Sequence, residues 1–148
     1  MKPLVRMAPL AIAAWLCMGS EAEAAGVRLG LGADYWATNR GLMHLSLTVD
    51  APLARNIYVG GRFGALATTS PTTFGVPLDL SVRALLARRR VYIEGLVGPW
   101  LLFDRGDGPL HLHGAFGFGL QSSSLSFGIE VGWLDPRPHV GLRLGFQI

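Results

Sequence analysis

The stretch from Leu125 to Ile148 constrains the fold more than any other part of the sequence. Large apolar residues occupy every second position on both sides of a short Asp-Pro-Arg-Pro break at 135–138. This alternation predicts two antiparallel β-strands joined by a turn. Each strand would be about ten residues long, the length with which a tilted strand crosses a lipid bilayer. Glycine and isolated charges occupy the alternate positions, which is unusual for the water-facing side of a soluble sheet.

The same alternation recurs along the rest of the chain, interrupted by residues that favour turns. We predict strands at 26–36, 41–50, 56–67, 78–87, 91–103, 110–121, 125–134 and 139–148. Connections would lie at 37–40, 68–77, 104–109 and 135–138 at one end, and at 51–55, 88–90 and 122–124 at the other. Eight strands form the smallest common closed membrane barrel, and an even number returns both chain ends to one side. The predicted fold is therefore all-β, an eight-stranded antiparallel up-and-down transmembrane β-barrel.

Residues 1–24 have the features of a cleaved signal peptide. Two basic residues, Lys2 and Arg6, precede an apolar run at 7–18, and Ala22-Glu23-Ala24 fits the small-x-small cleavage rule. The run is too short to span a membrane as a helix. We therefore predict export, with the barrel at 25–148 as a single domain. Cleavage would remove Cys17, the only cysteine, so no disulfide is expected.

Two orientations of the strand faces are possible, and they imply different proteins. A secreted lipocalin-like carrier would turn the large apolar side chains inward around a ligand. The other face, however, is rich in glycine and lacks lysine, which fits a crowded lumen better than an exposed surface. We therefore expect the apolar face to meet lipid. The aromatic residues expected at the membrane interfaces are Tyr35, Phe103, Trp133 and Phe146.

Together, the export signal, the eight strands, the glycine-rich lumen and the alternating last strand resemble the small OmpA/OmpX-type outer-membrane barrels. The resemblance covers the whole mature chain and is architectural. It implies a monomer in the outer membrane of a Gram-negative envelope, in contact with outer-membrane lipid. It also implies delivery to the barrel assembly machinery through the C-terminal strand. Family members usually end on an aromatic residue, whereas this sequence closes with Phe146-Gln147-Ile148.

The alternation places both signs of charge inside the barrel. The inward charges are expected to be Arg28, Arg62, Arg83, Arg143, Asp34, Asp50, Asp79, Glu94 and Glu130. Counting across the turns places Glu130 directly opposite Arg143, and Arg83 nearly opposite Glu94, with Arg62 at a similar depth. Buried charges persist when they are paired. We therefore predict that these residues plug the lumen. A narrow pore that opens by exchange of partners is the alternative.

The histidines also fall on the inward face. We expect His111, His113 and His139 to lie in solvent at the rim of the barrel, with a whole strand separating His139 from the other two. A zinc site needs at least three converging ligands. No metal site or cofactor is therefore predicted.

A lipid-modifying barrel enzyme is a further alternative. The lipid A 3-O-deacylases are eight-stranded barrels with a His-x-Ser pair and a downstream Glu, and His44-Leu45-Ser46 has that spacing. Asp34 lies nearby across the first turn, and a carboxylate–His–Ser arrangement could activate a hydroxyl. Both side chains face the lumen, however, and Tyr58 stands where the Glu would be. We therefore predict no catalysis, and the chain has no nucleotide or nucleic-acid motif. The expected role is structural, in envelope maintenance or surface interaction.

Overall fold

The computed structural model describes residues 26–103 and 108–148. The predicted signal peptide at 1–24, and the cleavage point before Ala25, lie outside these residues. Eight strands make up the described chain: β1 (Gly26–Trp36), β2 (Arg40–Ala54), β3 (Ile57–Thr68), β4 (Thr73–Leu86), β5 (Val91–Leu102), β6 (Leu110–Gln121), β7 (Leu125–Leu134) and β8 (Arg137–Gln147). No helix within the described ranges is long and apolar enough to cross a membrane.

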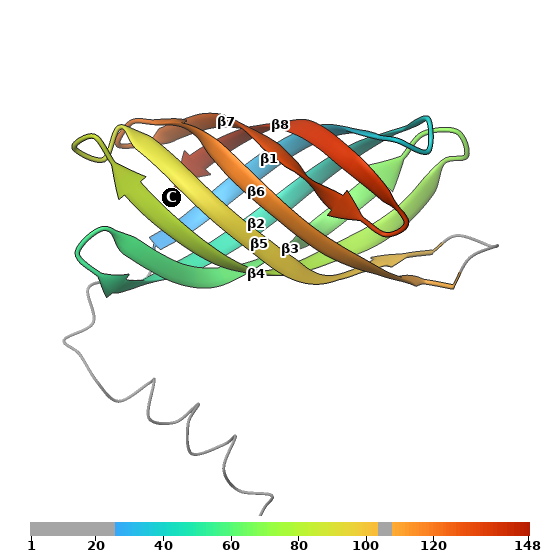
Figure 1. Ribbon diagram of the computed structural model, residues 1–148, viewed down its shortest axis with the longest axis horizontal. Helices are drawn as coiled ribbons and strands as arrows, with labels where there is room; N and C mark the ends of the chain where they lie inside the picture. Colours follow the sequence, from blue (N-terminus) through green and yellow to red (C-terminus); the bar gives the residue numbers. More distant parts are fainter. Residues whose placement is uncertain (1–25, 104–107) are drawn as a thin grey trace, which may run out of the picture.

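The strands form one closed antiparallel barrel in chain order, as the alternation predicts (Figure 1). Closure comes from pairing of β1 with β8, whose register runs from Arg28 opposite Gln147 to Trp36 opposite His139. The backbone N–H of Ile148 also donates to the Val27 carbonyl at 2.9 Å. The strands are steeply tilted, and β1 begins at the same end as β8 finishes. We call this end the turn end and the opposite one the loop end.

The prediction of a long loop at 68–77 is wrong. Strand β3 continues to Thr68 and β4 begins at Thr73, which leaves only 69–72 as a connection. The period-two pattern persists through this stretch, with Thr73, Gly75 and Pro77 buried and Phe74 exposed. The pattern could not be recognised from the sequence because its inward residues, Thr73, Gly75 and Pro77, are of types that usually mark loops. Strand β2 likewise extends beyond its predicted end, with a register shift between Pro52 and Ala54.

The two faces of the barrel have opposite chemistry. Large apolar side chains point outward and are widely exposed, as for Leu80 (69%) and Met43 (66%). The inward face carries buried Asp, Glu, Arg, His, Ser and Thr side chains. This confirms the predicted choice of inward face, and it is the reverse of an apolar carrier interior. Glycine permits close packing between strands, since a Cβ at Gly98 would collide with the Leu78 carbonyl oxygen of β4.

The loop end of the lumen contains an apolar cluster that the sequence analysis did not predict. Its members come from the loop-end portions of five strands and are at most 3% exposed: Trp36, Leu42, Leu66, Trp100, Leu102 and Leu134. The Trp36 indole N–H donates to the Leu134 carbonyl at 2.9 Å, which ties β1 to β7 past the intervening β8. We call this group the apolar cap. It covers the charged part of the lumen on the loop side.

Candidate functional site: the charged lumen

The middle of the lumen holds a ring of charged and imidazole side chains from six strands. Three carboxylates alternate with two guanidinium groups, and two histidines complete the circuit. In order, the ring runs Asp79, Arg62, Glu130, Arg143, Asp34, His139, His113 and back to Asp79. We call these seven residues the lumen ring.

Glu130 is the centre of the arginine side of the ring. Its two carboxylate oxygens accept four N–H groups, two from Arg62 and two from Arg143, at 2.7–3.3 Å. Arg62 also donates twice to Asp79, and Arg143 twice to Asp34. Charge-assisted, multidentate pairs of this kind are the strongest hydrogen bonds in proteins. The carboxylates are therefore satisfied even though Glu130 is only 1% exposed.

The histidine side of the ring is held by carboxylates at both ends. His113 Nδ1 lies 2.7 Å from Asp79 Oδ1, and His139 Nδ1 lies 3.2 Å from Asp34 Oδ1. Since a carboxylate accepts, each Nδ1 carries a proton. The two Nε2 atoms face one another at 3.1 Å, which requires one proton between them. Trp100 stacks on His113 at 4.3 Å between ring centroids and donates to Asp79.

This count of protons gives the ring a simple charge balance. Two neutral imidazoles would leave three carboxylates against two guanidinium groups. A proton shared between the two Nε2 atoms would supply the third positive charge and balance the ring. Neutrality matters because an unbalanced charge in a buried site is strongly disfavoured.

Among the described residues, one group could hold a metal ion, and its three members belong to the lumen ring. One ligand atom each from His113, Glu130 and His139 lies within 4.8 Å of the others. The Nδ1 contacts to Asp79 and Asp34 match the carboxylate–histidine arrangement of many metal sites. Glu130, however, already accepts from two guanidinium groups, whose positive charge opposes a cation there. The donor set therefore suits a shared proton better than a metal.

The predicted lumen charges divide into two groups. Arg62, Glu130 and Arg143 come together in the ring, although Glu130 pairs in register with Gly141 rather than with Arg143. The two side chains meet diagonally because the β7–β8 turn is centred one residue earlier than predicted. Arg83 and Glu94 do lie opposite in register, as expected. They are not bonded to each other.

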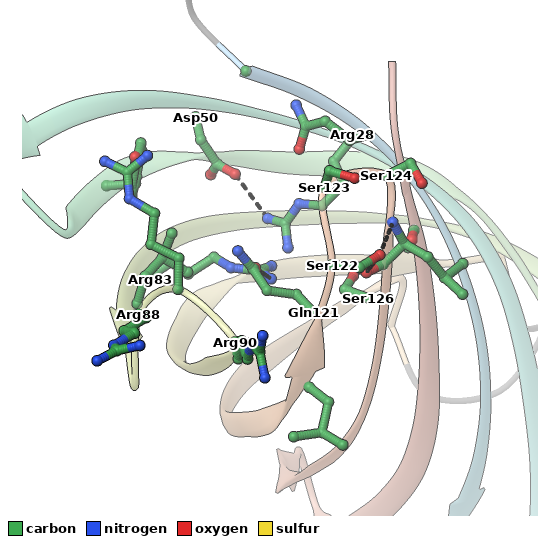
Figure 2. Close-up of a pocket in the computed structure, with 18 of the residues that line it drawn as sticks. Arg28, Asp50, Arg83, Arg88, Arg90, Gln121, Ser122, Ser123, Ser124 and Ser126 are labelled. Carbon is green, nitrogen blue, oxygen red and sulfur yellow. Dashed lines mark hydrogen bonds and ion pairs between the residues drawn. The ribbon is translucent and has the colours of Figure 1, made fainter.

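Arg83 and Glu94 belong to the turn-end half of the lumen. Glu94 and Asp50 both accept from Arg28, at 3.2 and 2.8 Å. Arg83 instead donates to the side-chain oxygen of Gln121 at 2.6 Å and lies over the Tyr92 ring at 3.9 Å. This half of the lumen opens into a cavity, drawn in Figure 2.

The prediction of solvated rim histidines is wrong. His111, His113 and His139 are all buried, at 8%, 0% and 4% exposure, because the apolar cap covers this end of the lumen. Strand β7 does separate His139 from the other two histidines, as predicted. The imidazoles of His113 and His139 nevertheless meet inside the lumen, which the prediction did not foresee. The alternation did place these residues inward, but it could not show what covers them.

The four aromatic residues expected at the membrane interfaces all lie on the outer face. Tyr35, Phe103 and Trp133 are exposed near the loop end, and Phe146 is exposed near the turn end. The structure thus places three of the four at the loop end and one at the turn end, and their position at membrane interfaces stays a prediction.

The residues of the alternative enzymatic site are inside the barrel and buried. His44 Nε2 lies 3.2 Å from Asp34 Oδ2, although neither His44 ring nitrogen makes a well-directed hydrogen bond. The Ser46 hydroxyl donates to the Gly30 carbonyl at 3.5 Å. Asp34 and His44 therefore lie close together, but the Ser46 hydroxyl is bonded to the backbone of β1 and not to His44.

Comparison with known proteins gives likeness of fold. No protein-family model matches the sequence, and no curated protein matches it. A solved structure described as a de novo design of transmembrane β-barrels aligns with a TM-score of 0.66 at 11% identity, over 87% of this chain and all of that one. The solution structure of the de novo designed TMB2.3 aligns with a TM-score of 0.59 at 15% identity, over 85% and 97%. The KdgM porin aligns with a TM-score of 0.35 at 6% identity, over 82% and 99%. The chain thus has the fold of small transmembrane β-barrels.

Proposed function

We propose that this protein is a monomeric, integral outer-membrane barrel with a sealed lumen and a structural or surface-interaction role, without catalysis. The observation that carries the proposal is the lumen ring, a closed circuit of buried, mutually bonded charges inside the barrel. An eight-stranded lumen is just wide enough for side chains to fill. The ring and the apolar cap support a sealed lumen, because they fill its middle and its loop end with buried side chains.

The outer face supports insertion in a bilayer. Its exposed apolar side chains cover the full length of the strands, and a water-soluble protein rarely exposes such a large apolar surface. The expected surroundings are outer-membrane lipid, with assembly through β8. The fold shared with designed transmembrane barrels supports the same assignment.

Conductance tests the sealed lumen. The protein, recovered from the outer-membrane fraction and showing a heat-dependent shift on a gel, would be inserted into a planar bilayer. We expect no stable conductance steps from the wild-type protein. Steps typical of a water-filled channel in the wild type would instead support the narrow-pore alternative.

A charged substitution on the outer face tests the membrane assignment. Leu80 is outward-facing near the middle of β4. We expect Leu80→Arg to lower the free energy of unfolding in lipid vesicles by about 2–4 kcal/mol, as for arginine at the bilayer midplane. Leu53→Arg, at the turn end of β2, is the matched control, with an expected cost of about 0–1 kcal/mol. Equal, negligible effects at both positions would contradict burial of this face in lipid.

A further inference from the structure

The turn end of the lumen opens into a cavity of about 860 Å³. This volume is in the range of sites that bind small molecules. Five arginines line it: Arg28, Arg83, Arg88, Arg89 and Arg90. Asp50 is the one carboxylate among the lining residues, and it is paired with Arg28. Figure 2 shows four of these arginines, Arg28, Arg83, Arg88 and Arg90, together with the contact between Arg28 and Asp50.

Arg83 is the residue that points to a ligand. It is 4% exposed, and its Nη1 atom is buried without a hydrogen-bond partner. Its other contacts are neutral, namely Gln121 and the Tyr92 ring. The nearest register partner with a negative charge, Glu94, is bonded to Arg28. A buried guanidinium N–H without an acceptor is costly, so an acceptor supplied by a ligand would complete the site.

Neutral hydrogen-bonding groups surround the same cavity. Ser122, Ser123, Ser124 and Ser126 contribute hydroxyl groups from the β6–β7 turn and the start of β7. The backbone N–H of Gln121 donates to the Arg90 carbonyl at 2.8 Å, which joins this turn to the arginine turn. The two turns therefore present one surface of guanidinium, hydroxyl and amide groups. Guanidinium groups bind phosphate oxygens in a planar, two-point geometry.

We propose that the turn-end cavity binds a phosphate group, with Arg83 as its central ligand and the arginine turn at 88–90 as its electrostatic entrance. The phosphate group belongs either to free phosphate or to the headgroup of an anionic phospholipid. This inference is independent of whether the lumen conducts, because the cavity lies on the turn side of the lumen ring.

Titration calorimetry tests the site. The protein would be refolded in a maltoside detergent, which contains no phosphate, and titrated with inorganic phosphate at constant ionic strength. We expect saturable binding that weakens about tenfold or more in Arg83→Gln, as for loss of a charged hydrogen bond. Gln121→Glu is the second variant, since its carboxylate would pair with Arg83 and repel phosphate while preserving the contact between the two residues. Gln121→Glu should therefore abolish the binding of inorganic phosphate.

Arg137→Gln is the matched control, because it removes the same charge at the loop end. Its phosphate affinity should equal that of the wild type, and a heat-dependent gel shift would verify that each variant is folded. No phosphate binding by the wild type, or equal binding by Gln121→Glu and wild type, would overturn the proposal.

A second titration distinguishes the two sources. With phosphatidylglycerol added to the micelles, competition with inorganic phosphate in the wild type and in the binding-competent Arg137→Gln control would assign the site to a phospholipid headgroup. Unchanged phosphate affinity would assign it to free phosphate.

Discussion

The two halves of the lumen are built from the same residue types but satisfy them differently. In the middle and toward the loop end, every charged member of the lumen ring bonds to an opposite charge or to an imidazole held by one. Toward the turn end, Arg83 has only neutral partners and faces a cavity. The same strands supply both halves. The difference lies in what covers them, an apolar cap on one side and an open mouth on the other.

Burial and charge pairing therefore change together along the barrel axis. Where the cap covers the lumen, the structure provides a closed circuit of paired charges. Where the mouth admits water, excess positive charge is tolerated and remains available to a ligand.

Removing the carboxylate at the centre of the ring should have the largest effect. In Glu130→Ala, two buried guanidinium groups lose their shared acceptor, so the free energy of unfolding should fall by about 3–5 kcal/mol. Denaturant unfolding in lipid vesicles, followed by tryptophan fluorescence, measures this loss. Asp50→Ala is the control in the turn-end half, where water from the cavity can replace the carboxylate, and we expect a smaller loss of about 1–3 kcal/mol. Equal losses would show that the two halves are not different in water access.

Adding a methyl group to the packed lumen should have the next largest effect. A Cβ at Gly141 would collide with the Asp34 carboxylate of the ring. We expect Gly141→Ala to cost about 1–3 kcal/mol of unfolding free energy through overpacking. Gly95→Ala is the control, because a Cβ there meets nothing within 4 Å. Similar stability of the two variants would indicate a loosely packed ring.

The histidine pair should show strong coupling within the ring. A double-mutant cycle of His113→Ala and His139→Ala should give an interaction energy of about 0.5–3 kcal/mol, the range for residues in one network. A parallel cycle of His113→Ala with Arg28→Ala combines one residue of the lumen ring with one residue of the turn-end half. It should be additive to within about 0.5 kcal/mol, since these residues share no partner. Coupling of the same size in both cycles would contradict two separate halves.

The turn-end arginine should contribute least to stability. Arg83→Met retains the contact with the Tyr92 ring but removes a charge with no anionic partner. Unfolding free energy in phosphate-free vesicles should change by less than about 1 kcal/mol. A loss comparable to that of Glu130→Ala would place Arg83 in a structural network instead.

The alternating pattern was enough to predict the barrel and its inward face. Every charge assigned to the lumen came from parity alone, because successive strand residues point to opposite faces. Parity could not predict which charges bond, since that depends on register and on reach across the lumen. Glu130 and Arg143 meet diagonally, and Glu94 turns from Arg83 to Arg28, for this reason.

The buried histidines were missed for a different reason. Trp36, Leu42, Trp100 and Leu134 have lumen parity in the sequence, but near strand ends such residues also fit a rim. Only the three-dimensional arrangement brings them together as the apolar cap. The nearest signal in the sequence was the placement of two tryptophans on the face otherwise rich in glycine and charge.

Accessibility of single cysteines tests the division of the lumen most directly. In a background without Cys17, Ser123→Cys would place a thiol at the exposed mouth of the turn-end cavity, and Ser46→Cys would place one at a buried position of β2. Both would be treated, folded in vesicles permeable to the reagent, with a charged thiol reagent. We expect rapid modification at position 123, and protection at position 46 until the barrel is unfolded. Equally rapid modification of both thiols in the folded protein would contradict a lumen sealed by the ring and the cap.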